Sequence, residues 1–398
     1  MNSAPALPDH QSTPADQAGA RSALTSRIEA LDLVRLLAIV GMMATHLLVP
    51  LSMTPEAAGP ESAAARIAGV LAEGASSTLF AVVGGCSLVL AARTRLLAGD
   101  RRGAVLAGVL RGALVTGLGL LLEMVPTSVV VVLVPFGLGM MLTAPLLLVP
   151  SRVLLLMVAL LSVIGGPLRA LVPGRVELGA VTLLSLDDPV GTARGLLLTG
   201  MYPVITWVPY LLLGVVLMRY LLRAQAAGRT ARRTLLAVAT GSALALIGHG
   251  LELTAGALGS SRPGAWYMAT AHTGTVADMA ATAGVSVALI AAATYLLPPH
   301  RHARTGILRS LRAAGAAPLT IYVTHVLLTG VAVIGYALTS GGDPAEMPWY
   351  VAGTGILGVH LALVVCFGAL LAATGRQGPL EGLISRLVRR VVPPRSAC

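Results

Sequence analysis

Long apolar runs follow one another along almost the entire chain, and short segments that carry most of the charge separate them. Ten of these runs reach about 20 residues, the length that a helix needs to cross a bilayer. They cover residues 29–52, 75–93, 104–124, 127–149, 152–172, 200–222, 232–257, 273–297, 313–339 and 348–374. Because apolar and polar residues do not alternate within them, a membrane β-barrel is excluded. The pattern predicts an all-α polytopic membrane protein with about ten transmembrane helices.

The two ends of the chain depart from this pattern. Residues 1–27 are rich in Ala, Pro, Ser, Asp and Gln and lack a continuous apolar stretch, which predicts a disordered tail and not a signal peptide. Near the other end, PLEGLISRLVRRVV (379–392) has the pattern of a short basic amphipathic helix that suits a membrane surface. We therefore expect a transmembrane domain at 28–375 and a basic amphipathic tail at 376–398.

Composition supports the membrane class and changes the meaning of the charge. The chain has 398 residues, of which 56% are hydrophobic and 11% charged, and its mean hydropathy is +0.83. A net charge of +11 would fit a nucleic-acid partner, but 23 of the 28 arginines fall in segments on one predicted side. That bias is the positive-inside signal, so it predicts two cytoplasmic termini and no nucleic-acid partner.

Neither cysteine nor histidine spacing predicts a metal site or a disulfide framework. The three cysteines are Cys86 and Cys366, inside predicted spans, and Cys398 at the end of the chain. His300 and His302 stand beside arginines in a predicted loop, and two histidines in such a setting do not define a metal site.

The first apolar run contains ionisable residues, which are costly at membrane depth and therefore point to function. Arg35 and His46 are roughly 16 Å apart along a helix, so Arg35 lies near the cytoplasmic surface and His46 in the outer half. Asp32 can pair with Arg35 across one helical turn. The structural alternatives are an interfacial ion pair for Arg35 and an interhelical hydrogen bond for His46.

Other polar side chains are predicted at similar depth. They lie at the outer ends of spans or deeper within them: Glu73, Tyr202, Trp207, His249, Glu252, His272, Asp278, His325 and His360. Together they predict an outward-facing polar cavity above an arginine-rich cytoplasmic rim. The structural alternatives are that His272 or Asp278 caps a helix and that His249, His325 and His360 pack between helices.

Three regions of the sequence resemble a known family. They are RIEALDLVRLLAIVGMMATH (27–46) with TLFAVVGGCSLVLAARTR (78–95), AHTGTVADMAATAGVSVAL (271–289), and APLTIYVTHVLL (317–328) with GPLEGLISRLVRR (378–390). They resemble the bacterial heparan-α-glucosaminide N-acetyltransferase-like proteins, which include YeiB-like proteins and belong to the multi-pass acyltransferase superfamily. The resemblance covers about residues 27–392. It implies a bacterial plasma-membrane enzyme that transfers an acyl group, usually acetyl, from a CoA thioester to a sugar amine or hydroxyl outside the cytoplasm.

The sequence departs from the family pattern at two places. Leu36 stands where a glycine usually follows the first-span arginine, and the loop at 53–74 lacks the histidine that the lysosomal enzyme carries there. His46 is therefore the histidine available for the chemistry that the resemblance implies.

The resemblance and the predicted depths assign roles. We expect His46 to act as the base, with Asp278 and His272 as further catalytic residues and Glu73 or Asp278 orienting the imidazole. The donor, acetyl-CoA or another acyl-CoA, is expected as a substrate and not as a bound cofactor. The candidates for binding its phosphates are Arg35, Arg93, Arg95, Arg101 and Arg102. Candidates for contacting the sugar-like acceptor are Glu73, Tyr202, Trp207, Thr320, Tyr322 and His325. For the arginine cluster at 93–102, the alternative is the positive-inside signal alone.

Two other functions stay open at this point, and so does homo-oligomer formation. Spans interrupted by Gly and Pro, as in LVPFG (133–137) and WVPY (207–210), also suit a transporter or flippase. A non-catalytic scaffold of envelope assembly is the third interpretation. Release of free CoA thiol would distinguish an acyltransferase from both.

Overall fold

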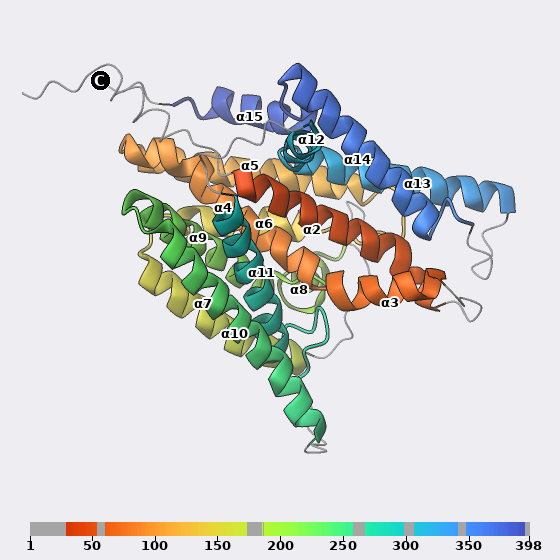
Figure 1. Cartoon of the computed structure of the whole chain (residues 1–398), viewed down its shortest axis with the longest axis horizontal. Helices are drawn as coiled ribbons and strands as arrows, with labels where there is room; N and C mark the ends of the chain where they lie inside the picture. The colour runs from red at the N-terminus through yellow and green to blue at the C-terminus, as the bar shows by residue number, and fades with distance from the viewer. Residues whose placement is uncertain are drawn as a thin grey trace, which may run out of the picture.

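The computed structural model describes residues 29–53, 60–172, 185, 187–257, 267–297, 306–340 and 348–394, so the predicted tail at 1–27 and both histidines at 300 and 302 lie outside it. Within these ranges every regular element is a helix, which confirms the all-α prediction (Figure 1). The helices are α2 (Glu29–Leu48), η1 (Val49–Met53), α3 (Pro60–Ala72), α4 (Ala75–Leu97), α5 (Arg101–Leu122), α6 (Leu133–Leu146), α7 (Ser151–Leu171), α8 (Pro189–Arg194), η3 (Gly195–Thr199), α9 (Val204–Ala226), α10 (Thr230–Ala257), α11 (Val276–Leu296), α12 (Gly306–Gly315), α13 (Pro318–Ser340), α14 (Thr354–Thr374) and α15 (Pro379–Val391).

Nine helical stretches in the described part of the chain are long and apolar enough to cross a membrane. The predicted span at 127–149 is the exception, because its helix α6 has only 14 residues, about 21 Å, against a hydrocarbon core of about 30 Å. The preceding residues, 125–131, are not helical, and Val132 is the N-cap of α6. The four valines at 129–132 fit this, because β-branched side chains have a low helix propensity.

The valines of this non-helical segment are buried or half-buried, and part of its backbone is hydrogen-bonded to side chains. Val129, Val131 and Val132 are almost fully buried, and the Val132 amide donates to the Tyr322 hydroxyl at 3.1 Å. Non-helical backbone at membrane depth is tolerated where protein covers it or where it lines a cavity. The prediction of ten regular spans is therefore wrong at this place, and the segment that replaces a helix lines the candidate site described below.

A helix that the sequence pattern did not predict, α3, occupies part of the expected loop at 53–74. Its alanine-rich sequence favours helix, and Glu73–Gly74 turns the chain from α3 into α4. Gly74 has φ 71°, and a Cβ there would lie 2.8 Å from the Ala271 Cβ. Glycine is needed here for both reasons, and the close approach brings Glu73 to the loop that contains His272.

The core lies on α4 and α9. In the most apolar part of each helical stretch, 78% of the residues are buried for the stretch that contains α4 and 72% for α9. For the peripheral α7 this share is only 17%. Gly85 and Gly214 let the two backbones touch, since a Cβ on either would lie 1.9 Å from a carbonyl oxygen of the other helix. On the outer helices, side chains such as Leu156, Leu246 and Val331 remain exposed for lipid.

Contacts between helix ends sort them into two groups. At one end, Arg95 donates to the Pro393 carbonyl at 3.2 Å, Arg309 donates to the Ala372 carbonyl at 2.7 Å, and Arg312 pairs with Glu29. At the other end, the Leu47 carbonyl accepts from the Gly353 amide at 2.8 Å. The first group, with α12 and α15, is named the arginine end, and the group around the C-terminus of α2 is named the histidine end (Figure 1).

Candidate active site

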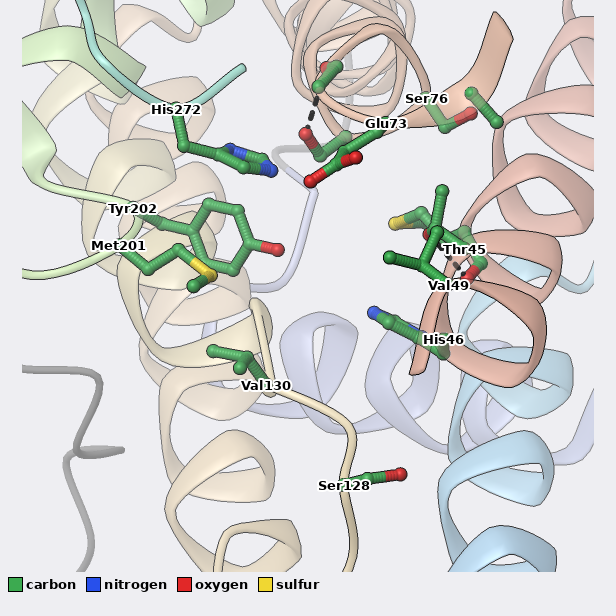
Figure 2. Close-up of a pocket in the computed structure, with 14 residues that line it drawn as sticks. Thr45, His46, Val49, Glu73, Ser76, Ser128, Val130, Met201, Tyr202 and His272 are labelled. Atoms are coloured by element: carbon green, nitrogen blue, oxygen red, sulfur yellow. Dashed lines mark hydrogen bonds between the residues drawn. The ribbon is translucent and has the colours of Figure 1, made fainter. Parts of the chain in front are cut away.

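His46 stands in the last turn of α2, where Pro50 brings the regular helix to a close in η1. Its ring faces a cavity of about 140 Å³ at the histidine end. The cavity is lined by Met42, Thr45, His46, Val49, Ala72, Glu73, Gly74, Ser76, Ser77, Ser128, Val130, Met201, Tyr202 and His272. Figure 2 shows His46 on one side of this space and Tyr202 and Met201 on the other, with the Tyr202 hydroxyl directed inward. The structure thus brings four predicted site residues together: His46, Glu73, Tyr202 and His272.

Glu73 supplies the negative charge of this pocket. Among the described residues that line it, Glu73 is the one carboxylate. Figure 2 shows its oxygens and the His272 ring directed toward one another across the upper part of the cavity. The pocket therefore offers two imidazoles, a carboxylate, a phenol and several hydroxyls, which suits a small polar molecule.

The loop that carries His272 is held in a costly conformation. His272 has φ 65°, the left-handed region that few non-glycine residues adopt. Arg169 of α7 fixes the loop by donating to the carbonyls of His272 at 2.9 Å, Thr273 at 3.0 Å and Gly200 at 3.2 Å. Charge-assisted hydrogen bonds of this kind are strong enough to hold such strain.

Asp278 supports the same loop from behind. Its carboxylate accepts from the Gly274 amide at 2.9 Å and from the Thr273 hydroxyl at 3.4 Å, while the Thr275 hydroxyl caps α11 by accepting from the Asp278 amide. Asp278 is buried and does not line the pocket. The structure therefore places it behind the loop, as a support of His272.

Burial sets the protonation states of His272 and Tyr202. Desolvation, with a smaller contribution from Arg169, lowers the pKa of His272 to about 4, so its imidazole is neutral at pH 7. Desolvation also raises the pKa of Tyr202, and the nearby Glu73 carboxylate adds to the effect. Tyr202 therefore remains a phenol that can donate a hydrogen bond. Its ring packs edge-on against His272 at 5.1 Å and Trp207 at 5.0 Å between centroids.

The partner of His46 differs from the predicted one. Neither Glu73 nor Asp278 bonds the imidazole; instead His46 Nδ1 lies 3.3 Å from His325 Nε2 of α13. Trp207 packs against Tyr202 but does not itself line the pocket. Tyr322 is fully buried with its hydroxyl on the Val132 amide, and Thr320 donates to Glu381 of α15 at 2.6 Å. Thr320, Tyr322 and Trp207 are therefore not brought to the pocket, and their roles toward a substrate stay predictions.

Two further cavities lie at the arginine end. The first, about 140 Å³, is mostly apolar, with Phe80, Phe136 and Met140 in its walls and Arg35, Arg111 and Glu381 as its charged residues. The second, about 170 Å³, lies between α4, α5 and α15 and contains Arg95, Arg111 and Arg389. Since Arg111 lines both, the two cavities are neighbours.

The predicted phosphate-binding arginines divide between these cavities and the surface. Arg35 lines the first cavity and bonds Asp32 at 2.5 Å and Ser87 at 2.9 Å. Arg95 lines the second and bonds Asp100 at 3.0 Å. Arg93, Arg101 and Arg102 line neither cavity.

The residues that sequence reasoning missed are Arg111 and Arg389. Arg111 falls inside the predicted span at 104–124, and a charge at that depth was a signal that could have singled it out. Arg389 lies on the predicted amphipathic helix at 379–392, where nothing in the pattern set it apart from its neighbours.

The histidine-end pocket and the apolar cavity approach each other along α4. Ser77 lines the histidine-end pocket and Phe80, one turn further along α4, lines the apolar cavity. The Phe80 ring lies 6.5 Å from that of Tyr322 between centroids. Phe80, in the wall of the apolar cavity, therefore packs near Tyr322, whose hydroxyl accepts from the Val132 amide.

With this geometry in place, the comparison with known families is informative. The family profile described as "Heparan-alpha-glucosaminide N-acetyltransferase, catalytic" matches residues 27–252, more than half of the chain. The chain belongs to this family. A second profile, "Protein of unknown function (DUF418)", matches residues 217–390. No curated protein gives a significant match to the sequence.

Family membership makes the protein a multi-pass membrane protein with a heparan-α-glucosaminide N-acetyltransferase-like catalytic domain, and it implies acetyltransferase activity. The predicted resemblance is confirmed. The first match contains His46, Glu73 and Tyr202, whereas His272, His325 and His360 fall in the second. The pocket thus combines residues from both matched regions.

Proposed function

We propose that the protein transfers an acetyl group from acetyl-CoA to an amine or hydroxyl of a sugar-like acceptor that occupies the pocket of His46. The observation that carries this proposal is the pairing of a polar pocket, which holds a histidine base and a carboxylate, with an arginine-lined apolar cavity one helical turn away. The apolar walls suit the pantetheine arm. Arg95, Arg111 and Arg389 suit the phosphates of CoA.

The chemistry needs little beyond these groups, because a thioester is already activated. His46 takes the proton from the acceptor nitrogen or oxygen as that atom attacks the thioester carbonyl. The carbon–sulfur bond then breaks, and the proton passes to the sulfur, so the products are the acetylated acceptor and free CoA thiol. Tyr202 can donate a hydrogen bond into the pocket, and Glu73 can orient an amine or hydroxyl of the acceptor.

The proposed orientation places the arginine end in the cytoplasm and the histidine end outside it. The positive-inside rule supports this, and the structure groups the arginine-bearing helix ends together. Both termini then face the cytoplasm of a cell whose plasma membrane holds the protein. Acetyl-CoA is a cytoplasmic metabolite, so the donor would enter between α4, α5 and α15.

Thiol release from acetyl-CoA tests the proposal. Purified protein in detergent is given acetyl-CoA with a panel of amino sugars, and His46→Ala is compared with His249→Ala, which changes an exposed histidine outside the pocket. Loss of a general base should lower the rate by about 10²-fold or more, while His249→Ala retains it. Unchanged release by folded His46→Ala would contradict the role of this residue.

A transporter is the second candidate, because a polar pocket and an apolar cavity one helical turn apart along α4 also suit a substrate pathway through the membrane. The same assay decides. A transporter would bind its substrate without releasing free thiol, and the acyltransferase proposal would then be wrong.

A further inference from the structure

Three histidines from three helices meet beside the candidate active site. His46 on α2, His325 on α13 and His360 on α14 form a row, in which His325 is 1% exposed and His360 2% exposed. His46 and His325 are 279 positions apart in the sequence. Within the described ranges no group of histidine, cysteine, aspartate or glutamate residues is arranged to hold a metal ion. Their ring geometry shows how the three side chains contact one another.

The rings of His46 and His325 are joined edge to edge. Their planes differ by only 7°, and their centroids lie 5.5 Å apart, whereas His46 Nδ1 and His325 Nε2 are 3.3 Å apart. Because the nitrogen–nitrogen distance is so much shorter than the centroid distance, both nitrogens lie on the facing edges of the rings. This is the geometry of a hydrogen bond in the plane of the rings and not of a face-to-face stack.

The far end of the row has a defined tautomer. His360 Nδ1 lies 2.9 Å from the Ile356 carbonyl, which can only accept, so Nδ1 carries the proton. In the neutral ring this leaves Nε2 as an acceptor. His360 Nε2 and His325 Nδ1 are both buried and have no hydrogen-bond partner among the described residues. Their rings are nearly perpendicular at 77°, with centroids 5.0 Å apart.

We propose that His325 and His360 are positioning residues that fix the tautomer of His46. In this arrangement His360 Nε2 accepts from His325 Nδ1–H, and His325 Nε2 accepts from His46 Nδ1–H. This hydrogen bond removes the cost of leaving both nitrogens buried without a partner. His46 Nε2 then carries no proton and is the nitrogen that an acceptor in the pocket can reach.

This assignment rests on the proposed function, in which His46 is the base, and it explains why a base at this position is ready before substrate arrives. A free imidazole exchanges between two tautomers, and the bond made by one nitrogen decides the state of the other. When His46 takes a proton, His325 also holds the resulting imidazolium in place. The row ends at the Ile356 carbonyl, so the proton itself returns through His46 to the leaving sulfur.

The test compares His325→Leu, which keeps bulk but removes both nitrogens, with His325→Gln, whose amide oxygen can still accept from His46 Nδ1–H. Nitrogen-15 NMR of histidine-labelled protein in lipid bilayers reports the tautomer of each ring, with His46 assigned by its loss in His46→Gln. We expect His46 to carry its proton on Nδ1 in the wild type and in His325→Gln. In His325→Leu it should shift toward the Nε2–H tautomer.

Thiol release supplies the second readout. We expect His325→Leu to lower kcat by about tenfold or more with KM for the donor unchanged, and His325→Gln to recover part of the loss. His360→Leu should give a smaller loss, and His249→Leu none. An unchanged His46 tautomer in His325→Leu would overturn the proposal, as would an Nε2–H tautomer in the wild type. Since the NMR result does not depend on turnover, it separates failure of this proposal from failure of the acyltransferase assignment. If His325→Leu does not fold, His360→Leu replaces it, because His325 Nδ1–H then loses its acceptor and His325 can donate from Nε2 to His46 Nδ1. His46 should then shift toward the Nε2–H tautomer, and an unchanged His46 tautomer in His360→Leu would overturn the proposal.

Discussion

The histidine end and the arginine end of the molecule are built in different ways. At the histidine end the pocket is formed by the places where helices stop: the end of α2, the Glu73–Gly74 turn, the non-helical residues 128–131 and the loop at 271–275. At the arginine end the cavities lie between regular helices, and α15 covers them with Ile384 and Val388 buried.

The difference separates two kinds of task. Irregular backbone can aim several polar groups at one point, but each loop must be held by specific hydrogen bonds. Regular helices give a smooth apolar slot that needs only a few charges at its rim. We therefore expect changes at the histidine end to alter the rate of the reaction, and changes at the arginine end to alter donor binding or stability.

The largest expected difference is between two arginines that each donate hydrogen bonds to backbone carbonyls, one at each end of the molecule. Arg169 donates to three carbonyls of the His272 loop and its neighbour, and Arg219 donates to the carbonyls of Val149 and Leu147 at 2.7 and 2.5 Å. We expect Arg169→Met to lower kcat by about 10²-fold, because a displaced loop moves His272 and Tyr202 away from a productive geometry.

Arg219→Met is the matched control. It removes the same type of bond, so it should lower the thermal unfolding temperature while leaving kcat within about twofold. Thiol-release kinetics and unfolding are measured on both proteins. Equal losses of rate in the two variants would show that the ends are not functionally distinct.

Arg111 should act on donor binding. It is the side chain shared by the two arginine-end cavities, and we expect Arg111→Gln to raise KM for acetyl-CoA by about tenfold with kcat nearly unchanged. Arg102→Gln serves as the control, because Arg102 is exposed and lines neither cavity. An equal rise in KM in the control would favour a diffuse electrostatic effect over a site.

The same contrast explains what the sequence could and could not predict. Apolar runs define regular helices, so nine spans and the amphipathic α15 were visible in the pattern. The prediction of a span at 127–149 was wrong because an apolar run of valines is compatible both with a buried non-helical segment and with a helix. Tertiary contacts, such as the one between Val132 and Tyr322, decide between the two.

The candidate site follows the same division. His46 stood out because an ionisable residue interrupts an apolar run, and Glu73, Tyr202 and His272 because they flank such runs. The partnership of His46 with His325, in contrast, joins positions from opposite ends of the chain and leaves no local trace. The same is true of Thr320, whose bond to Glu381 removes it from the pocket.

The smallest effect concerns Glu123, which lies where α5 ends and the non-helical segment before α6 begins. Burial raises the pKa of this carboxyl to about 7, opposed in part by a hydrogen bond from the Val131 backbone. The pKa of Glu123 in the folded protein is above its ordinary value, so the folded state holds this proton more tightly than the unfolded state. The contribution of the protonated carboxyl to the free energy of unfolding is therefore fully present below about pH 4.5 and is lost as the pH rises through 7. Glu123→Gln should therefore raise the unfolding temperature at pH 8 by about 2–4 °C and make no difference near pH 4.5. Asp187→Asn, at an exposed position, should shift neither value; a Glu123→Gln effect that is equal at both pH values would mean that the carboxyl is not desolvated.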